Sequence, residues 1–142
     1  MTDAELVLRK LVVLREHLSR ARRRRPATAE ALRVDVDIQD MLALSVLVAI
    51  QEAVDIAFHI IADEQWGAPA SYAEGFELLA RHGIIDVHLA DALARGVGLR
   101  NRLAHAYATL DVDRLWRELP DGLEALERFA QAVARWAPPL TP

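Results

Sequence analysis

Residues 27–66 contain no glycine and no proline, and this uninterrupted stretch is the feature that most constrains the fold. Glycine and proline weaken or end helices most strongly, so the stretch predicts one long helix. If this helix breaks, we expect the break at Val34-Asp35-Val36-Asp37, because valine is β-branched. Residues 41–50 are apolar except for Ser45. A helix that is apolar on all sides is a buried helix, so this segment should lie at the centre of a bundle.

A second helical pattern precedes this stretch. Apolar residues recur at helical spacing, namely Leu6, Leu8, Leu11, Val12, Leu14 and Leu18. The arginine run 22–25 and then Pro26 follow, which is typical of a helix C-terminus. We interpret the arginine run as a solvated helix end, with contact to an RNA backbone as the alternative.

The second half of the chain predicts three more helices. Ser71 and Glu74 form a capping-box pattern for a short helix that reaches about Arg81, and Gly83 suits the position after its end. Asp86 begins the next helix, which we expect to run through residues 100–107 despite two glycines. Residues 111–136 should be helical with an interruption at Pro120, and residues 137–142 form a loose tail. The prediction is an all-α bundle of about five helices, in a single domain that covers residues 1–142.

Composition and charge exclude several classes of function. The formal net charge of −4 argues against a wholly basic nucleic-acid binder but allows a local basic cleft. The chain has no cysteine, so it has neither disulfides nor thiolate metal sites. The N-terminus is polar and acidic, unlike a signal peptide, and the apolar run 41–50 is about half of the roughly 20 residues that a membrane span needs. We therefore expect a cytoplasmic protein with no membrane partner, no metal and no cofactor.

The segment 100–107 carries the residues best suited to chemistry. Arg100, Asn101, His105 and Tyr107 place a guanidinium, an amide, an imidazole and a phenol within eight residues. Arginine binds phosphate through a planar fork of donors, and histidine moves protons near neutral pH. This set favours metal-independent cleavage of RNA, with His105 as general acid or base for attack by a ribose 2′-hydroxyl and Arg100 stabilising the phosphate charge.

Helical geometry limits how these side chains can meet. On an ideal helix Asn101 and His105 lie about 40° apart, whereas Arg100 and His105 lie about 140° apart. Asn101 could therefore orient the imidazole or bind a ligand. Arg102 points in another direction, where it could either bind phosphate or be solvated. Either the helix is distorted near Gly98 or two copies of the segment meet in a symmetric homodimer, which is the alternative we favour.

The residues from 71 to 111 resemble the HEPN superfamily, specifically HepT-like toxins. In that family a short helix that begins near a Ser-Tyr pair, here Ser71-Tyr72, precedes a helix that ends in Arg-Asn-x-x-x-His-x-Tyr. Here that motif is Arg100-Asn101 followed by His105 and Tyr107. The lead-in segments 76–79 and 83–85 also fit. The likeness is close over residues 51–111 and loose from residue 5.

The resemblance implies a ribonuclease toxin of a type VII-like toxin–antitoxin pair that acts as a homodimer. The catalytic arginine and histidine of the family correspond to Arg100 and His105. The implied partner is a small nucleotidyltransferase antitoxin that transfers AMP from ATP to the motif tyrosine, here Tyr107. Phosphates added beside Arg100 would occupy the RNA-phosphate site and repel the substrate.

Two other functions remain open at this point. A non-catalytic module that binds a nucleotide or a nucleotidyltransferase would tolerate the substitution His105→Ala. A structural dimerisation bundle would bury Arg100 and His105 in salt bridges, whereas a nuclease needs both in one open, positive cleft. An arginine and histidine pair on a helix more often marks an interface or a solvated face than a catalytic site.

Some acidic and histidine positions of the long helix are also candidates. His59 has Asp55 and Asp63 one turn away on either side, which could serve a metal, although an interfacial histidine is the commoner interpretation. The acidic side chains that flank the apolar centre could support the Arg100 site, with an ordinary polar face or salt bridge as the default; they are Asp37, Asp40, Glu52 and Asp55.

Overall fold

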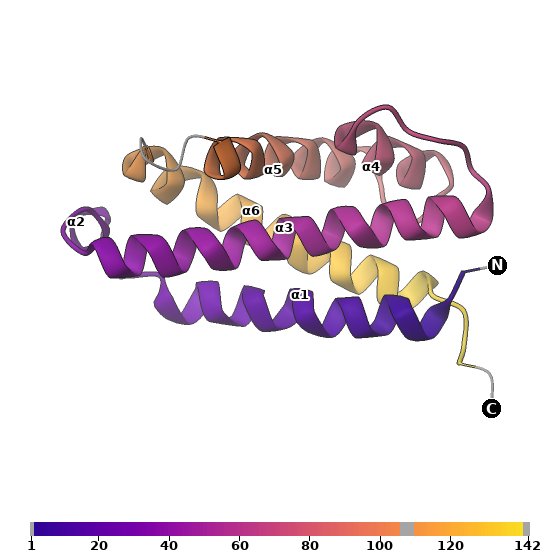
Figure 1. Cartoon of the computed structure of the whole chain (residues 1–142), viewed down its shortest axis with the longest axis horizontal. Helices are drawn as coiled ribbons and strands as arrows, with labels where there is room; N and C mark the ends of the chain where they lie inside the picture. The colour runs from indigo at the N-terminus through magenta and orange to yellow at the C-terminus, as the bar shows by residue number, and fades with distance from the viewer. Residues whose placement is uncertain (1, 106–109, 141–142) are drawn as a thin grey trace.

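The computed structural model describes residues 2–105 and 110–140, and every regular element in that part of the chain is an α-helix. The predicted all-α fold is therefore confirmed, with six helices in place of about five. Their bounds are α1 Ala4–Arg24, α2 Ala29–Arg33, α3 Val36–Glu64, α4 Tyr72–Arg81, α5 Val87–His105 and α6 Val112–Trp136. Figure 1 shows α3 in the middle, with α1 along one side, α4 and α5 along the other, and α6 crossing behind.

The helix α3 is the central element, because it contacts each of the other five helices. The predicted break before it is confirmed: Asp35 caps α3 by accepting a hydrogen bond from the amide of Ile38 at 3.1 Å. The helix ends at Gln65, whose left-handed backbone (φ 59°) closes its C-terminus. Its buried residues extend from Leu42 to Ile61, well beyond the apolar run seen in the sequence.

By length and composition alone, α3 could cross a membrane. That result differs from the expectation based on residues 41–50, because the apolar character extends beyond them to an 18-residue window of the helix. However, 56% of its most apolar window is buried inside the bundle. Packing against five other helices therefore accounts for this composition.

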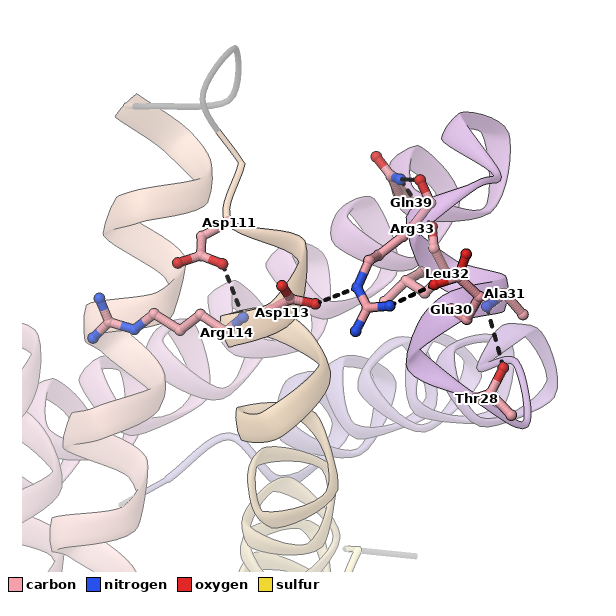
Figure 2. Close-up of polar contacts among 9 residues, drawn as sticks. All are labelled: Thr28, Glu30, Ala31, Leu32, Arg33, Gln39, Asp111, Asp113 and Arg114. Carbon is pink, nitrogen blue, oxygen red and sulfur yellow. Dashed lines mark hydrogen bonds and ion pairs between the residues drawn. The ribbon is translucent and has the colours of Figure 1, made fainter.

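The short helix α2 joins the start of α3 to the start of α6 (Figure 2). Arg33 donates from Nε to Asp113 of α6 at 2.7 Å and from Nη1 to Glu30 at 2.6 Å. These two carboxylates raise the pKa of the Arg33 guanidinium above its ordinary value, and Asp113 has the larger effect. Gln39 of α3 donates to the carbonyl of Leu32 at 2.8 Å, and this bond satisfies one of the carbonyls left without a partner at the end of α2.

The segment from α4 to α5 follows the predicted capping signals. Ser71 Oγ accepts from the amide of Glu74 at 3.1 Å, and the Glu74 carboxylate accepts from the amide of Ala70 at 3.0 Å. The reciprocal bond thus reaches Ala70 and not Ser71 itself. Gly83 adopts φ 79°, a conformation that favours glycine, and Asp86 caps α5 through the amide of Leu89 at 2.7 Å. This tight connection places α4 against α5.

The interruption expected at Pro120 is wrong, because α6 runs through it from Val112 to Trp136. A proline inside a helix removes one backbone hydrogen bond, at a cost of about 3 kcal/mol. Leu119 and Leu123 on either side of it are buried in the core, and their burial offsets that cost. Residues 137–140 follow without helical structure, as expected.

We predict that Gly122→Ala stabilises the protein. Gly122 lies inside α6, and a Cβ atom added there meets no neighbouring atom within 4 Å. Because glycine is about 0.5–1 kcal/mol less favourable than alanine within a helix, the free energy of unfolding measured by urea denaturation should rise by that amount. The control is Gly83→Ala, whose positive φ should make the same change destabilising. Equal effects of the two substitutions would contradict this account.

Candidate functional site

Arg100 faces the junction of α3 and α4, since its neighbours Leu99 and Leu103 are buried and fix the rotation of α5. Its Nε donates to Gln51 Oε1 on α3 at 3.2 Å, and its Nη1 donates to Asn101 Oδ1 at 3.2 Å. Its guanidinium carbon lies 5.6 Å from the ring centre of Tyr72, the first residue of α4. All of these partners are uncharged. Among the described residues no carboxylate pairs with Arg100, so none of them neutralises its positive charge.

A chain of polar contacts continues from Gln51 to α1. Gln51 Nε2 donates to Asp55 Oδ1 at 2.9 Å, and the second oxygen of Asp55 lies 3.6 Å from Lys10 Nζ. Lys10 also lies 3.4 Å from a carboxylate oxygen of Glu52. The acidic side chains Asp55 and Glu52 are therefore connected to the Arg100 site through Gln51 and Lys10, and neither touches the guanidinium itself. Sequence reasoning considered these acids but missed Gln51.

His105 is the last residue of α5 and is exposed to solvent. No described residue bonds to its imidazole. The helix is continuous from Val87 to His105, so a distortion near Gly98 does not bring His105 to Arg100. An ideal helix places two side chains at this spacing about 140° apart. Asn101 bonds to Arg100 and not to His105, and Tyr107 lies outside the described residues.

Arg102 lies on the side of α5 that faces α6. Its Nη2 is 2.6 Å from a carboxylate oxygen of Glu118, whose other oxygen accepts from Arg114 Nε at 2.9 Å. One carboxylate thus joins two arginines and ties the last turns of α5 to α6. Arg102 is therefore partly exposed and paired with Glu118, and it connects α5 to α6.

Of the remaining sequence candidates on α3, Asp37 and Asp40 are exposed, and His59 lies beside one of its two neighbouring acids. His59 Nε2 lies 3.0 Å from Asp63 Oδ2, although the pair lacks hydrogen-bond geometry, whereas Asp55 is directed to Gln51 and Lys10. Within the described ranges, no group of three histidine, aspartate or glutamate side chains could hold a metal ion.

Three of the four residues in the arginine run are exposed, as expected for a solvated helix end, but two members of the run also contact α6. Arg22 lies 3.5 Å from Glu127 of α6, and the guanidinium of Arg25 covers the ring of Trp116 at 4.5 Å. Both of these arginines therefore help to hold α1 against α6.

The chain matches the ribonuclease HepT-like family over residues 14–133, and it belongs to that family. It is 34% identical over 99 residues to the mRNA nuclease HepT of Shewanella oneidensis, covering 70% of this chain and 74% of that protein. It is 29% identical over 83 residues to the tRNA nuclease HepT of Aphanizomenon flos-aquae, covering 58% of this chain and 56% of that protein. The resemblance based on the Arg-Asn-x-x-x-His-x-Tyr motif is thereby confirmed.

A solved structure shows the same fold. The tri-AMPylated HEPN toxin of Shewanella oneidensis, in complex with the MNT antitoxin, superposes with a TM-score of 0.83 at 28% identity. The match covers 95% of this chain and 99% of that one. The arrangement of α1 to α6 is therefore that of a HEPN toxin.

We predict that Glu118→Gln loosens the end of α5. The side chains of Glu118 and of its partners Arg102 and Arg114 are each at least about a third exposed. The free energy of unfolding should therefore fall by only about 0.5–1 kcal/mol. Hydrogen–deuterium exchange should nevertheless rise at Leu103 to His105, because the contact between helices is lost. The matched control is Glu124→Gln, which removes a pair with Arg128 within α6 alone. Equal exchange in the two variants would contradict a role for Glu118 in fixing this turn.

Proposed function

We propose that this chain is a metal-independent ribonuclease and the toxin of a toxin–antitoxin pair. The observation that carries the proposal is the state of Arg100, a partly buried guanidinium held by amides and an aromatic ring with no carboxylate beside it. Such a group is oriented yet keeps its charge for an anionic ligand. Membership of the ribonuclease HepT-like family and the mRNA and tRNA nuclease relatives support RNA phosphate as that ligand.

In the proposed reaction a ribose 2′-oxygen attacks the adjacent phosphorus, and the bond from phosphorus to the 5′-oxygen breaks. His105 accepts the proton of the 2′-hydroxyl or donates one to the leaving oxygen, since an exposed imidazole can do either near neutral pH. Arg100 binds the phosphate and stabilises the charge that develops on its oxygens. Arg102 has no role in the step proposed here, and its contact with Glu118 directs it toward α6.

We infer that the working site forms between two copies of the chain. Arg100 and His105 point apart on a straight helix, so one copy does not direct both at one phosphate. The face of α3 that carries Gln51 continues along the helix as an apolar stripe of Met41 (39% exposed), Leu44 (57% exposed) and the partly buried Val48. Burial of this stripe in a symmetric homodimer would bring the α5 segments of two copies together.

The partner that we propose is a nucleotidyltransferase antitoxin that transfers AMP to Tyr107. Support comes from the related HEPN toxin, which is described as tri-AMPylated and in complex with the MNT antitoxin. Added phosphates near Arg100 and His105 would compete with the RNA phosphate for the same charge. We also propose that residues 1–142 form a single domain and that the protein acts in the cytoplasm.

The other two functions have less support. A structural bundle would bury Arg100 and His105 in salt bridges, but in the described part of the chain neither residue has one and His105 is exposed. A non-catalytic binding module would need Arg100 but not His105. The effect of His105→Ala therefore separates the binding module from the nuclease.

We predict that Arg100→Ala and His105→Ala each lower RNA cleavage at least about 100-fold, the usual contribution of an acid–base or charge-stabilising group. Cleavage of a fluorescent RNA by the purified protein, in the presence of EDTA, measures this directly. The control is Arg95→Ala, an exposed arginine on the same helix, which should cleave like the wild type. Cleavage by His105→Ala at the wild-type rate, or loss of all activity in EDTA, would contradict the proposed reaction.

We predict that Leu44→Glu converts a homodimer into monomers, because it places a charge in the proposed interface. Sedimentation velocity gives the mass of each species. The matched control is Val12→Glu on α1, a residue that is 59% exposed and thus as accessible as Leu44. A monomeric wild type, or a dimer that survives Leu44→Glu, would overturn the proposed interface.

A further inference from the structure

We propose that Gln51 is a positioning residue for Arg100: its side-chain carbonyl fixes the guanidinium through Nε and leaves Nη2 and the second N–H of Nη1 for the scissile phosphate. The inference rests on the proposed ribonuclease function. Its basis is the 3.2 Å hydrogen bond from Arg100 Nε to Gln51 Oε1, which joins α5 to α3 across a separation of 49 residues in sequence.

The orientation of the Gln51 amide is determined by its other contact. An ionised carboxylate only accepts hydrogen bonds, so the Asp55 oxygen at 2.9 Å must face the NH₂ end of the amide. The carbonyl end of Gln51 then faces Arg100. Asp55 is in turn held by Lys10 at 3.6 Å, and this ion pair fixes the far end of the chain of contacts on α1. Gln51 thus presents an acceptor, and not a donor, to the guanidinium.

The position of this bond on the guanidinium matters for phosphate binding. Nε is taken by Gln51 and one N–H of Nη1 by Asn101, while Nη2 has no partner among the described residues. The Tyr72 ring lies against the guanidinium, and Phe58 packs edge-on against that ring at 5.6 Å. The guanidinium is therefore held at Nε and on the face that lies against the Tyr72 ring. Its outer N–H groups remain available for the paired oxygens of a phosphate.

An amide is better suited to this position than a carboxylate. A glutamate at position 51 would also accept from Arg100, but it would cancel the charge needed for RNA and would repel Asp55. Glu52, the neighbouring acid, is directed to Lys10 and leaves Arg100 unpaired. Gln51 therefore orients the guanidinium without neutralising it.

The test compares Gln51→Met, which keeps the length but removes the acceptor, with Gln51→Glu, which keeps an acceptor and adds a charge. Loss of a hydrogen bond to a charged group corresponds to about a tenfold change. We expect Gln51→Met to lower kcat about tenfold with little change in KM, and Gln51→Glu to raise KM because RNA binds more weakly. The control is Gln131→Met, an exposed glutamine bonded to Glu127 one turn away, which should behave like the wild type.

Two further readouts separate positioning from a merely structural role. Gln51→Met combined with Arg100→Ala should be no slower than Arg100→Ala alone, because Gln51 acts only through the guanidinium. In ¹⁵N spectra, the Arg100 Nε–H resonance, identified by its loss in Arg100→Lys, should exchange slowly with water in the wild type. It should shift and exchange faster in Gln51→Met.

The outcomes distinguish this inference from the proposed function. If Arg100→Ala is inactive but Gln51→Met cleaves RNA like the wild type, the ribonuclease stands and the role of Gln51 is overturned. If the wild type does not cleave RNA, the proposed function fails, and the Nε–H resonance alone decides whether Gln51 holds Arg100. An unchanged resonance in Gln51→Met overturns the inference in either case.

Discussion

The packing of α3 against all five other helices is the constraint on which the rest of the structure depends. This burial stabilises the fold, because apolar area removed from water contributes about 25 cal/mol per Å². It also fixes the rotation of α3, so that Gln51 must face the end of α5 while Met41 and Leu44 remain on the surface. The core therefore determines both the environment of Arg100 and the face proposed to meet a second copy.

At the Arg100 site, the contacts that orient the guanidinium do not neutralise its charge. Arg33 and Arg102 join helices through carboxylates, whereas Arg100 is held by uncharged groups among the described residues. A paired arginine adds to the connections between helices, but its charge is already satisfied. An arginine oriented by amides keeps its attraction for phosphate. In the proposed function, this difference would allow a protein of net charge −4 to bind RNA locally.

Local signals in the sequence were enough to predict the helices and the break before α3, because caps such as Asp35 and Ser71 act over three residues. Pro120 was mispredicted, because burial of Leu119 and Leu123 outweighs a local penalty. The motif identified Arg100 and His105 as candidates. Gln51 and the Arg102–Glu118 pair could not be predicted, because both depend on how α5 lies against α3 and α6, which no short-range pattern encodes.

The central claim is that Arg100 of one copy works with His105 of another, and subunit mixing tests it most directly. Arg100→Ala and His105→Ala dimers, each inactive alone, would be mixed under conditions that exchange subunits, with mixed dimers counted by native mass spectrometry. A mixed dimer has one intact composite site, so random exchange should restore about a quarter of wild-type cleavage. Full exchange without any recovered cleavage would contradict the account and place both residues of each site in a single chain.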